Sequence, residues 1–183
     1  MLPPDRKAKG IIDDENGNRL PFWKLSSARS EFGVPHYMKI DIERYDGICI
    51  AGLNNAIAPQ YISIEMDHLC GASDLGRLAE LGYKGFKIIC QNNAWHQVTT
   101  GNLAFYRWGP NQSIIRRLTK LRTLGWELFT GRKFGESGPW GEKTSGTWHS
   151  VDHARLVWRQ LGDVDAQLGT RGVGWWFDIH AKK

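Results

Sequence analysis

The chain lacks the features that mark secreted and membrane-spanning proteins. None of its 183 residues fall in an uninterrupted apolar run approaching the roughly 18 residues that a transmembrane helix needs. The first 20 residues hold no apolar core of the kind found in signal peptides. We therefore expect neither a membrane span nor secretion, and we predict a cytoplasmic protein.

Cysteine is also scarce. The three cysteines, Cys49, Cys70 and Cys90, are odd in number and form no CxxC pair. Two of them lie within or beside apolar runs, so the pattern predicts buried free thiols in a reducing compartment and not a disulfide framework.

Several catalytic and binding motifs are absent as well. There is no GxSxG, no Walker lysine loop and no Cys–His signature of covalent catalysis. The segment 169–174 has GxxGxG spacing and leads into a predicted strand, so it does not match a nucleotide loop. His149 and His153 stand four apart without an HExxH motif, and we favour capping or surface roles over a metal site. No metal site is predicted.

The charge of the chain is only mildly basic. A formal net charge of +5 permits an acidic partner but does not require one. One predicted helix carries basic residues between apolar ones, which suggests either a surface helix with a solvated basic face or a nucleic-acid or membrane contact. We favour the surface helix and expect no nucleic-acid partner. Its apolar positions are Ile114, Ile115, Leu118, Leu121 and Leu124, and its basic ones are Arg116, Arg117, Lys120 and Arg122.

What the chain does contain is a series of apolar runs that end in acids. Residues 35–43, with Asp41 and Glu43, and residues 61–67, with Glu65 and Asp67, are such runs, and a helix-length segment, 45–58, lies between them. This pattern predicts a βαβ unit with carboxylates at the carboxyl ends of its strands, where ligands bind in parallel α/β sheets. A helix over 73–81 with Ser73 as its cap, a third strand at 84–90, a helix over 151–161 capped by Ser150 and a final strand at 174–181 complete an α/β pattern.

The remaining segments divide the chain. Residues 1–32 are predicted to be a partly flexible lead with a short helix over 21–32 that Gly33 ends. Residues 33–183 form one domain, in which 91–173 interrupt the β-α rhythm as an insertion with six of the nine tryptophans. These tryptophans are either core residues, which we favour, or a platform for stacking sugars.

Asp41 and Glu43 are the strongest candidates for chemistry. As acids at a strand tip they can accept hydrogen bonds from hydroxyls or take a proton as a general base. With equal weight, they can cap a helix or form an ion pair with Lys39 or Arg44.

Several segments together resemble the second half of FkbM-family methyltransferases. They are PHYMKIDIERYD, APQYISIEMD, LAELGYKGFKII, SGPWGE and WWFDIHAKK, within a match that covers about 150 residues from Gly33 onward. KIDIE is the most specific piece, and Arg44 stands where the family usually has glycine.

The resemblance implies a partial Rossmann-like class I methyltransferase sheet with helices on both faces. Residues 36–42, 60–66, 84–90 and 174–181 would be strands four to seven, in the order four-five-seven-six with the last strand antiparallel. The family uses S-adenosylmethionine and typically methylates hydroxyl groups of sugars, glycolipids or natural products. Asp41 and Glu43 would then lie near the acceptor as catalytic acids, with Glu65 as a weaker substrate-binding candidate.

The family's first strand and glycine-rich cofactor loop have no counterpart before Pro35. The resemblance therefore implies a truncated methyltransferase that binds S-adenosylmethionine weakly or not at all, and no cofactor-loop residue is carried over. Without the first strand, 36–42 becomes a sheet edge that either self-associates or is covered by 1–32. The alternative is a non-catalytic remnant that acts as a carbohydrate-binding or scaffolding module.

Overall fold

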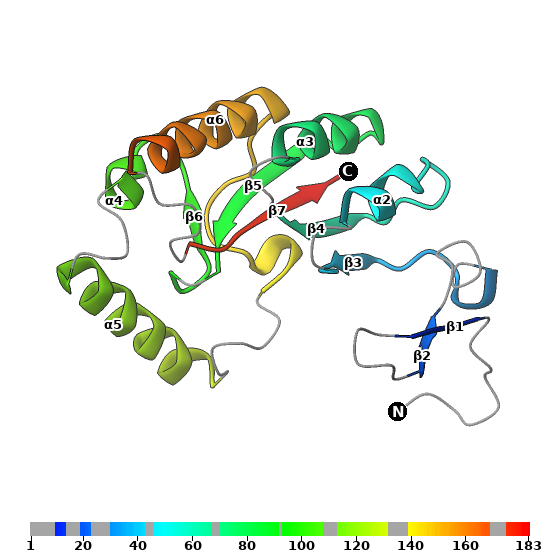
Figure 1. Ribbon diagram of the computed structural model, residues 1–183, viewed down its shortest axis with the longest axis horizontal. Helices are drawn as coiled ribbons and strands as arrows, with labels where there is room; N and C mark the ends of the chain where they lie inside the picture. Colours follow the sequence, from blue (N-terminus) through cyan, green and yellow to red (C-terminus); the bar gives the residue numbers. More distant parts are fainter. Residues whose placement is uncertain are drawn as a thin grey trace. The chain divides into compact units, whose positions relative to one another are not determined.

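The computed structural model describes residues 10–13, 19–22, 30–42, 46–66, 70–91, 93–107, 113–131, 139–168 and 175–183 (Figure 1). Its chain divides into two compact units, Met1–Pro35 and His36–Lys183, which are described separately.

The first unit contains a β-hairpin that the sequence analysis missed. Strand β1 (Gly10–Asp13) pairs antiparallel with β2 (Arg19–Phe22). The helix predicted over 21–32 is therefore wrong at its start, and the described helical residues are 30–32. Gly33 follows them with a φ of +79°, which confirms it as the residue that ends this helix. The connection between the strands contains Asn16-Gly17, a sequence typical of hairpins.

The second unit is built on a five-stranded mixed sheet (Figure 1). Its strands are β3 (Tyr37–Ile40), β4 (Tyr61–Glu65), β7 (Phe177–Lys182), β5 (Gly85–Cys90) and β6 (His96–Val98), in the spatial order β3-β4-β7-β5-β6. β3 and β4 are parallel, and β7 runs antiparallel between β4 and β5. The four predicted strands therefore form, and the last one is antiparallel as expected. β6 was not predicted and pairs antiparallel with β5 at the sheet edge.

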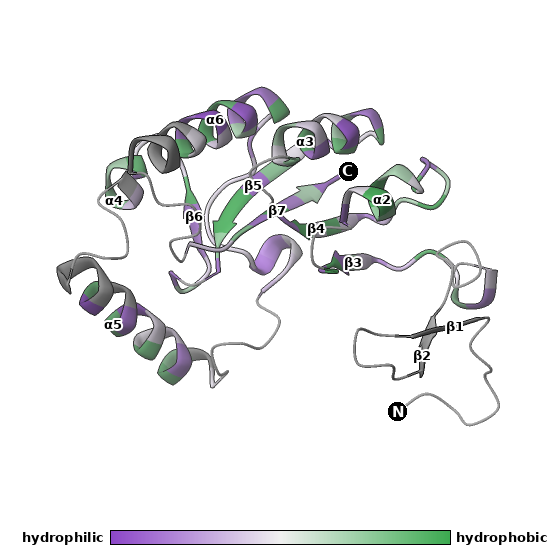
Figure 2. Cartoon of the chain, in the orientation of Figure 1, coloured by the Kyte–Doolittle hydropathy of each residue, from purple (hydrophilic) through white to green (hydrophobic). Residues whose placement is uncertain are grey.

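One face of the sheet is apolar and carries a layer of helices. The layer consists of α2 (Asp46–Ala51), α3 (Gly71–Glu80) and α6 (Val151–Leu168), with the short α4 (Leu103–Arg107) beside α6 (Figures 1 and 2). Trp158 of α6 meets Phe177 of β7 edge-to-face, with 6.3 Å between ring centroids. The core below these helices includes fully buried Ile62, Ile64 and Ile179, whose β-branched side chains suit a buried strand.

The helix boundaries follow local signals with some differences. α2 ends at Ala51, earlier than the predicted 45–58, and α3 begins two residues before Ser73. Ser73 Oγ donates to the Cys70 carbonyl (2.7 Å) and is not the cap, whereas Ser150 Oγ accepts from the His153 amide (3.3 Å) at the start of α6 as expected. Gly82 has a φ of +84° just after α3, so it ends that helix as predicted.

The opposite face of the sheet is polar. In the described part of the chain it is met by the 3-10 turn η1 (Gly141–Lys143) and not by an α-helix, which differs from the expectation of helices on both faces. The physical reason is the side-chain pattern. The residues of β4 and β7 that point to this face are serine, histidine, acids, lysine and tyrosine. An apolar helix face offers no hydrogen-bond partners for these groups.

The segment 91–173 is only partly an elaboration. Its β6 and α6 belong to the main sheet and its helical layer, whereas α5 (Ser113–Thr130) makes few contacts. The apolar positions Leu118, Leu121 and Leu124 of α5 are 45 to 65% exposed, so the expectation of a single solvated basic face is incomplete.

Two composition-based expectations can also be compared with the structure. All three cysteines are free, but only Cys90 is buried, and Cys70 is exposed because it lies in the turn before α3. No described helix is both long and apolar enough to cross a membrane.

Candidate functional site

The polar face of the sheet presents its side chains in three rows that cross the strands. The rows follow from the register, which places Tyr37 beside Tyr61 and Tyr61 beside Lys182, because alternate residues of a strand share a face. The first row, at the amino ends of the parallel strands, is Tyr37, Tyr61, Lys182 and Gly85. The second row is Lys39, Ser63, His180 and Lys87. The third row, at the carboxyl ends of the parallel strands, is Asp41, Glu65, Asp178 and Ile89.

The third row is acidic and lies at the carboxyl ends of β3 and β4. Asp41 follows β3, Glu65 ends β4, and Asp178 is the direct cross-strand partner of Glu65 on β7. The structure thus brings together two predicted residues, Asp41 and Glu65. It adds Asp178, which sequence reasoning missed, while Glu43 lies outside the described residues.

Asp41 is held by an ion pair. Lys39 Nζ lies 3.0 Å from Asp41 Oδ2, and the Asp41 side chain is 40% exposed. This is one of the two outcomes that the sequence left open. Burial alone pulls the pKa of Lys39 down, but its hydrogen bond with Asp41 and the nearby charge of Asp178 outweigh burial and leave that pKa raised. Lys39 therefore remains a cation beside Asp41 and Asp178.

Asp178 is the most perturbed acid of the row. It is 1% exposed, and burial raises the pKa of its carboxyl to about 7. Gln91 Nε2 donates to Asp178 Oδ1 at 2.6 Å and, with Lys39, opposes the rise, whereas the charges of Glu65 and Asp41 add to it. Near neutral pH, both the protonated and the ionised forms of Asp178 are therefore populated.

His180, in the second row, lies next to Asp178 of the third row. Its Nε2 is 3.9 Å from Asp178 Oδ2, which is within ion-pair range but too long for a hydrogen bond, and this buried nitrogen has no hydrogen-bond partner in the described part of the chain. Burial lowers the pKa of His180 to about 3, so the ring is neutral at pH 7 and the contact is not a salt bridge. The two side chains are therefore buried polar neighbours and not an ion pair at pH 7.

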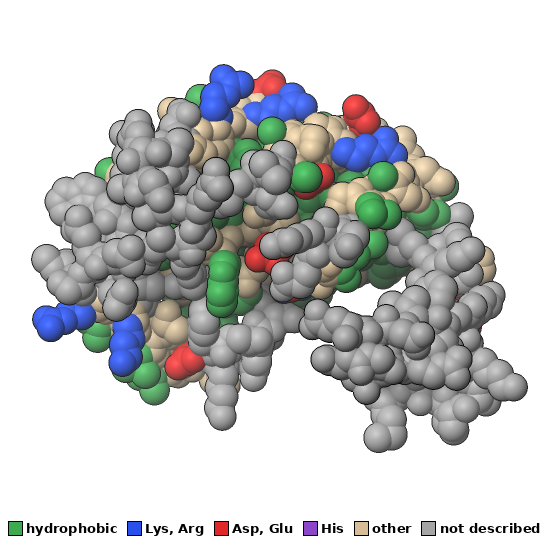
Figure 3. Space-filling model, viewed as in Figure 1, with side chains coloured by type: hydrophobic (Ala, Val, Ile, Leu, Met, Phe, Trp, Pro, Cys, Tyr) green, Lys and Arg blue, Asp and Glu red, His purple; other side chains and the backbone are tan. Residues whose placement is uncertain are grey.

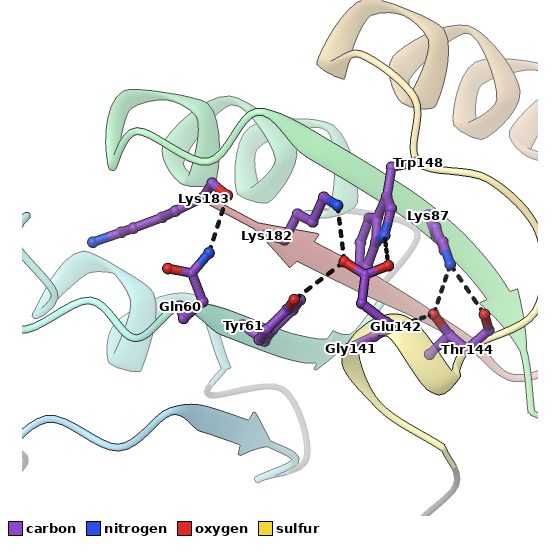
Figure 4. Close-up of polar contacts among 9 residues, drawn as sticks. All are labelled: Gln60, Tyr61, Lys87, Gly141, Glu142, Thr144, Trp148, Lys182 and Lys183. Carbon is purple, nitrogen blue, oxygen red and sulfur yellow. Dashed lines mark hydrogen bonds and ion pairs between the residues drawn. The ribbon is translucent and has the colours of Figure 1, made fainter.

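At the other end of the polar face, Glu142 of η1 contacts the first row (Figure 4). Its Oε1 accepts from Lys182 Nζ (2.8 Å) and Tyr61 Oη (3.1 Å), and its Oε2 accepts from Trp148 Nε1 (2.8 Å). The Lys182 and Trp148 hydrogen bonds lower the pKa of Glu142 to about 2. These bonds fix η1 on the sheet, so Glu142 has a structural role.

Lys87 also contacts the residues around η1. Lys87 Nζ donates to the Thr144 carbonyl (3.0 Å) and to Thr144 Oγ1 (2.9 Å), and it lies 4.3 Å from the Trp148 ring centroid (Figure 4). Burial lowers the pKa of Lys87, whose residue is 2% exposed. The hydrogen bonds and the aromatic face therefore compensate for the buried ammonium.

An aromatic cluster borders the first row. The Trp140 ring stacks on the Tyr37 ring with 4.8 Å between centroids and an 8° interplanar angle, and Tyr61 and His36 approach Trp140 edge-on. Trp140 is 37% exposed, whereas Trp95 and Trp158 are buried. Core packing therefore holds for some tryptophans, and Trp140 keeps part of its surface open to solvent.

The missed residues had a sequence signal. Asp178, His180 and Lys182 alternate with Phe177, Ile179 and Ala181, which is the pattern of a strand with one apolar and one polar face. The described residues contain no group of three or more His, Cys, Asp or Glu placed to hold a metal ion.

Comparison of the chain with protein-family models, curated proteins and solved structures found no significant match.

Proposed function

We propose that this chain carries the acceptor side of an S-adenosylmethionine-dependent methyltransferase of the FkbM type, which methylates a hydroxyl group of a sugar, glycolipid or natural product. The observation that carries this proposal is the sheet order β3-β4-β7-β5 with β7 antiparallel. This order corresponds to strands four, five, seven and six of the class I methyltransferase sheet. The order is non-sequential, because β7, the last strand of the chain, lies between β4 and β5 and runs antiparallel to both.

The acidic row supplies the chemistry that the proposal needs. Asp41, exposed and held by Lys39, accepts the acceptor hydroxyl proton or orients that hydroxyl, and Glu65 hydrogen-bonds a neighbouring hydroxyl. Ionisation of Asp178 adds negative charge to the row beside Asp41 and Glu65. Glu43 supports Asp41 in this proposal, as the resemblance implies.

The described residues do not fit the cofactor. They include no glycine-rich turn from a first strand into a helix, and the unit that precedes β3 contains a β-hairpin. We therefore assign no residue of this chain to S-adenosylmethionine and derive no step through it.

A second candidate is carbohydrate binding without catalysis, which the stacked and partly exposed Trp140 favours. Aromatic rings with one open side bind the apolar faces of sugars, and Trp140 is held in place by Tyr37. In this case the polar face contributes hydrogen bonds and transfers nothing.

Methyl transfer is tested with the full chain, S-adenosylmethionine labelled in its methyl group at millimolar concentration, and a panel of mono- and oligosaccharides. We expect slow labelling of an acceptor that is lost in Asp41→Asn and kept in Asp152→Asn, an exposed aspartate of α6 that also pairs with an arginine. Calorimetric sugar binding without any label transfer would favour the second candidate. Absence of both would refute both candidates.

A further inference from the structure

Trp176 is the most exposed tryptophan in the described part of the chain. The residue is 53% exposed, whereas Trp95 and Trp158 are 4% and 5% exposed. Tryptophan is highly buried on average, so an indole open to solvent at the end of a strand is unusual. Trp176 directly precedes β7 and therefore lies at the sheet edge that carries the acidic row. Figure 3 shows acidic and hydrophobic side chains on the visible face where Figure 1 places the beginning of β7.

The neighbours of Trp176 set the direction of its ring. The rings of Trp175 and Phe177 both meet the Tyr106 ring of α4, with 5.3 and 5.8 Å between centroids. Both side chains therefore point to the face of the sheet that carries the helices. The Gln91 amide donates to the Trp176 carbonyl (2.7 Å), which continues the pairing of β5 with β7 by one residue. Because successive side chains of an extended chain point to opposite faces, Trp176 points to the polar face.

Trp176 and Gln91 thus add a fourth row beyond the acidic one. Gln91 is tied to the third row as well, because its Nε2 donates to Asp178 Oδ1 (2.6 Å). Trp176 is two residues from Asp178, the cross-strand partner of Glu65, so Trp176 and Glu65 are diagonal neighbours at roughly 7–8 Å. The edge of the polar face therefore places an exposed aromatic ring within the span of one small molecule from a carboxylate.

We propose that Trp176 is the platform on which the methyl acceptor lies, and that this acceptor is a sugar. The inference rests on the proposed function, because it places the acceptor of that reaction. A pyranose ring has C–H groups on its faces and hydroxyls at its rim. The indole binds the apolar face of the ring, and carboxylates accept hydrogen bonds from the hydroxyls. Glu65 and Asp41, which are both partly exposed, receive those hydrogen bonds.

The arrangement of the acids favours a polyol as the acceptor. Asp41 and Glu65 occupy one row on neighbouring strands, about 5 Å apart, which suits two hydroxyls on adjacent ring carbons. An aromatic acceptor with a single hydroxyl would stack on Trp176 but use only one of the two acids. A cationic acceptor gains less, because Lys39 Nζ lies 3.0 Å from Asp41 Oδ2 and already neutralises that charge.

The other exposed tryptophan, Trp140, is less suited to place the acceptor. It stacks on Tyr37, which is four residues and about 13 Å along the chain from Asp41. A sugar on Trp140 would therefore contact the first row, whereas a sugar on Trp176 adjoins the third row. The two tryptophans are alternative platforms, and a substitution at each distinguishes them.

The test is calorimetric titration of the full chain with methyl β-pyranosides of galactose, glucose, mannose and xylose, and with the open-chain alditols of the same sugars. We expect millimolar binding of at least one pyranoside and none of its alditol, which has the hydroxyls but no rigid apolar face. Trp176→Leu should weaken the binding about tenfold, and Trp176→Phe, which keeps an aromatic ring, should weaken it less.

A matched control makes the same aromatic-to-leucine change elsewhere: Phe129→Leu replaces a 93% exposed residue of α5 and should bind like the unmodified chain. The urea midpoints of these variants should agree, because each replaced residue is more than half exposed. The proposal is overturned if no pyranoside binds, or if Trp176→Leu binds as tightly as Phe129→Leu. It is also overturned if Trp140→Leu abolishes binding that Trp176→Leu retains.

Transfer of the methyl label, measured on the same variants, separates this inference from the proposed function. Label transfer with an acceptor KM that is unchanged in Trp176→Leu would overturn the inference and leave the proposed function standing. Sugar binding that is lost in Trp176→Leu, without label transfer by any variant, would support Trp176 as the sugar platform and refute methyl transfer.

Discussion

Replacing Asp178 with asparagine should stabilise the folded chain, and by more as the pH rises. Asparagine keeps the volume of the side chain and an acceptor for the Gln91 Nε2 hydrogen bond. It removes only the ability to ionise in a site that is 1% exposed.

The magnitude follows from the two pKa values of Asp178. The carboxyl has a pKa of about 7 in the folded chain and 3.8 in the unfolded chain. Below pH 3.8 the carboxyl is protonated in both states, so its ionisation does not change the free energy of unfolding. Between pH 3.8 and 7 the unfolded chain has lost the proton that the folded chain retains, so stability falls as the pH rises. Above pH 7 the cost is constant, at about 4 kcal/mol.

The assay is urea unfolding of both proteins from pH 4 to pH 9. The free energy of unfolding of Asp178→Asn should exceed that of the unmodified chain by less than ~1 kcal/mol at pH 4 and by several kcal/mol at pH 8. Asp152→Asn is the control, since Asp152 is exposed, and its difference should stay within about 0.5 kcal/mol at every pH. A pH-independent difference, or a less stable Asp178→Asn at pH 8, would refute the reasoning about the buried acidic row.

Three further predictions concern the acceptor side, the sheet edge and a glycine. Asp41→Asn should abolish methyl transfer without loss of stability, and Glu43→Gln should reduce it less; equal losses would mean that the two roles are wrongly assigned. β3 is the edge strand of its sheet and Ile42, just beyond it, is 45% exposed, so Ile42→Lys should reduce any self-association seen by sedimentation velocity. Gly146→Ala should cost about 2 kcal/mol or more in urea unfolding, because Gly146 has a φ of +78° and a Cβ there would displace the Gln97 side chain.

Matched substitutions control the last two predictions. Ile48→Lys places the same charge at an exposed isoleucine of α2 and should leave self-association unchanged. A Cβ added at Gly125 of α5 would meet no atom within 4 Å. Gly125→Ala should therefore stabilise the chain slightly, since alanine favours the helix. If Ile48→Lys dissociates the chain as well as Ile42→Lys does, the β3 edge is not the contact. A Gly146→Ala as stable as the unmodified chain would show that Gln97 moves at no cost.

The strands could be predicted from the sequence because their signals are local. Apolar runs such as Tyr61–Glu65 and Gly85–Cys90 are short, rich in β-branched residues and bounded by turns. The acids Asp41 and Glu65 were found for the same reason, since they follow those runs directly. The β1–β2 hairpin was missed because the first 20 residues mix Pro, Gly, Asp, Asn and Lys without a clear period, so its short strands carry no comparable signal.

The partners of these acids could not be predicted in the same way. Asp178 lies near the start of β7 and not at its end. It joins the acids at the carboxyl end of β4 only because β7 runs antiparallel to β4. Burial and the pKa it produces depend on residues that are distant in the chain, such as Gln91 and Lys39. Periodicity likewise showed which α5 residues share a face, but not that the leucines among them would be exposed.

The central claim is that the acidic row handles the proton of an acceptor hydroxyl, and the pH dependence of methyl transfer tests it most directly. Label transfer should be measured from pH 5 to pH 9 at one fixed millimolar concentration of S-adenosylmethionine for the unmodified chain and for Asp178→Asn. We predict that the rate rises with pH and bends near the pKa of about 7 held by Asp178, and that this bend is absent in the variant. Identical pH profiles, or no transfer at any pH, would contradict the account.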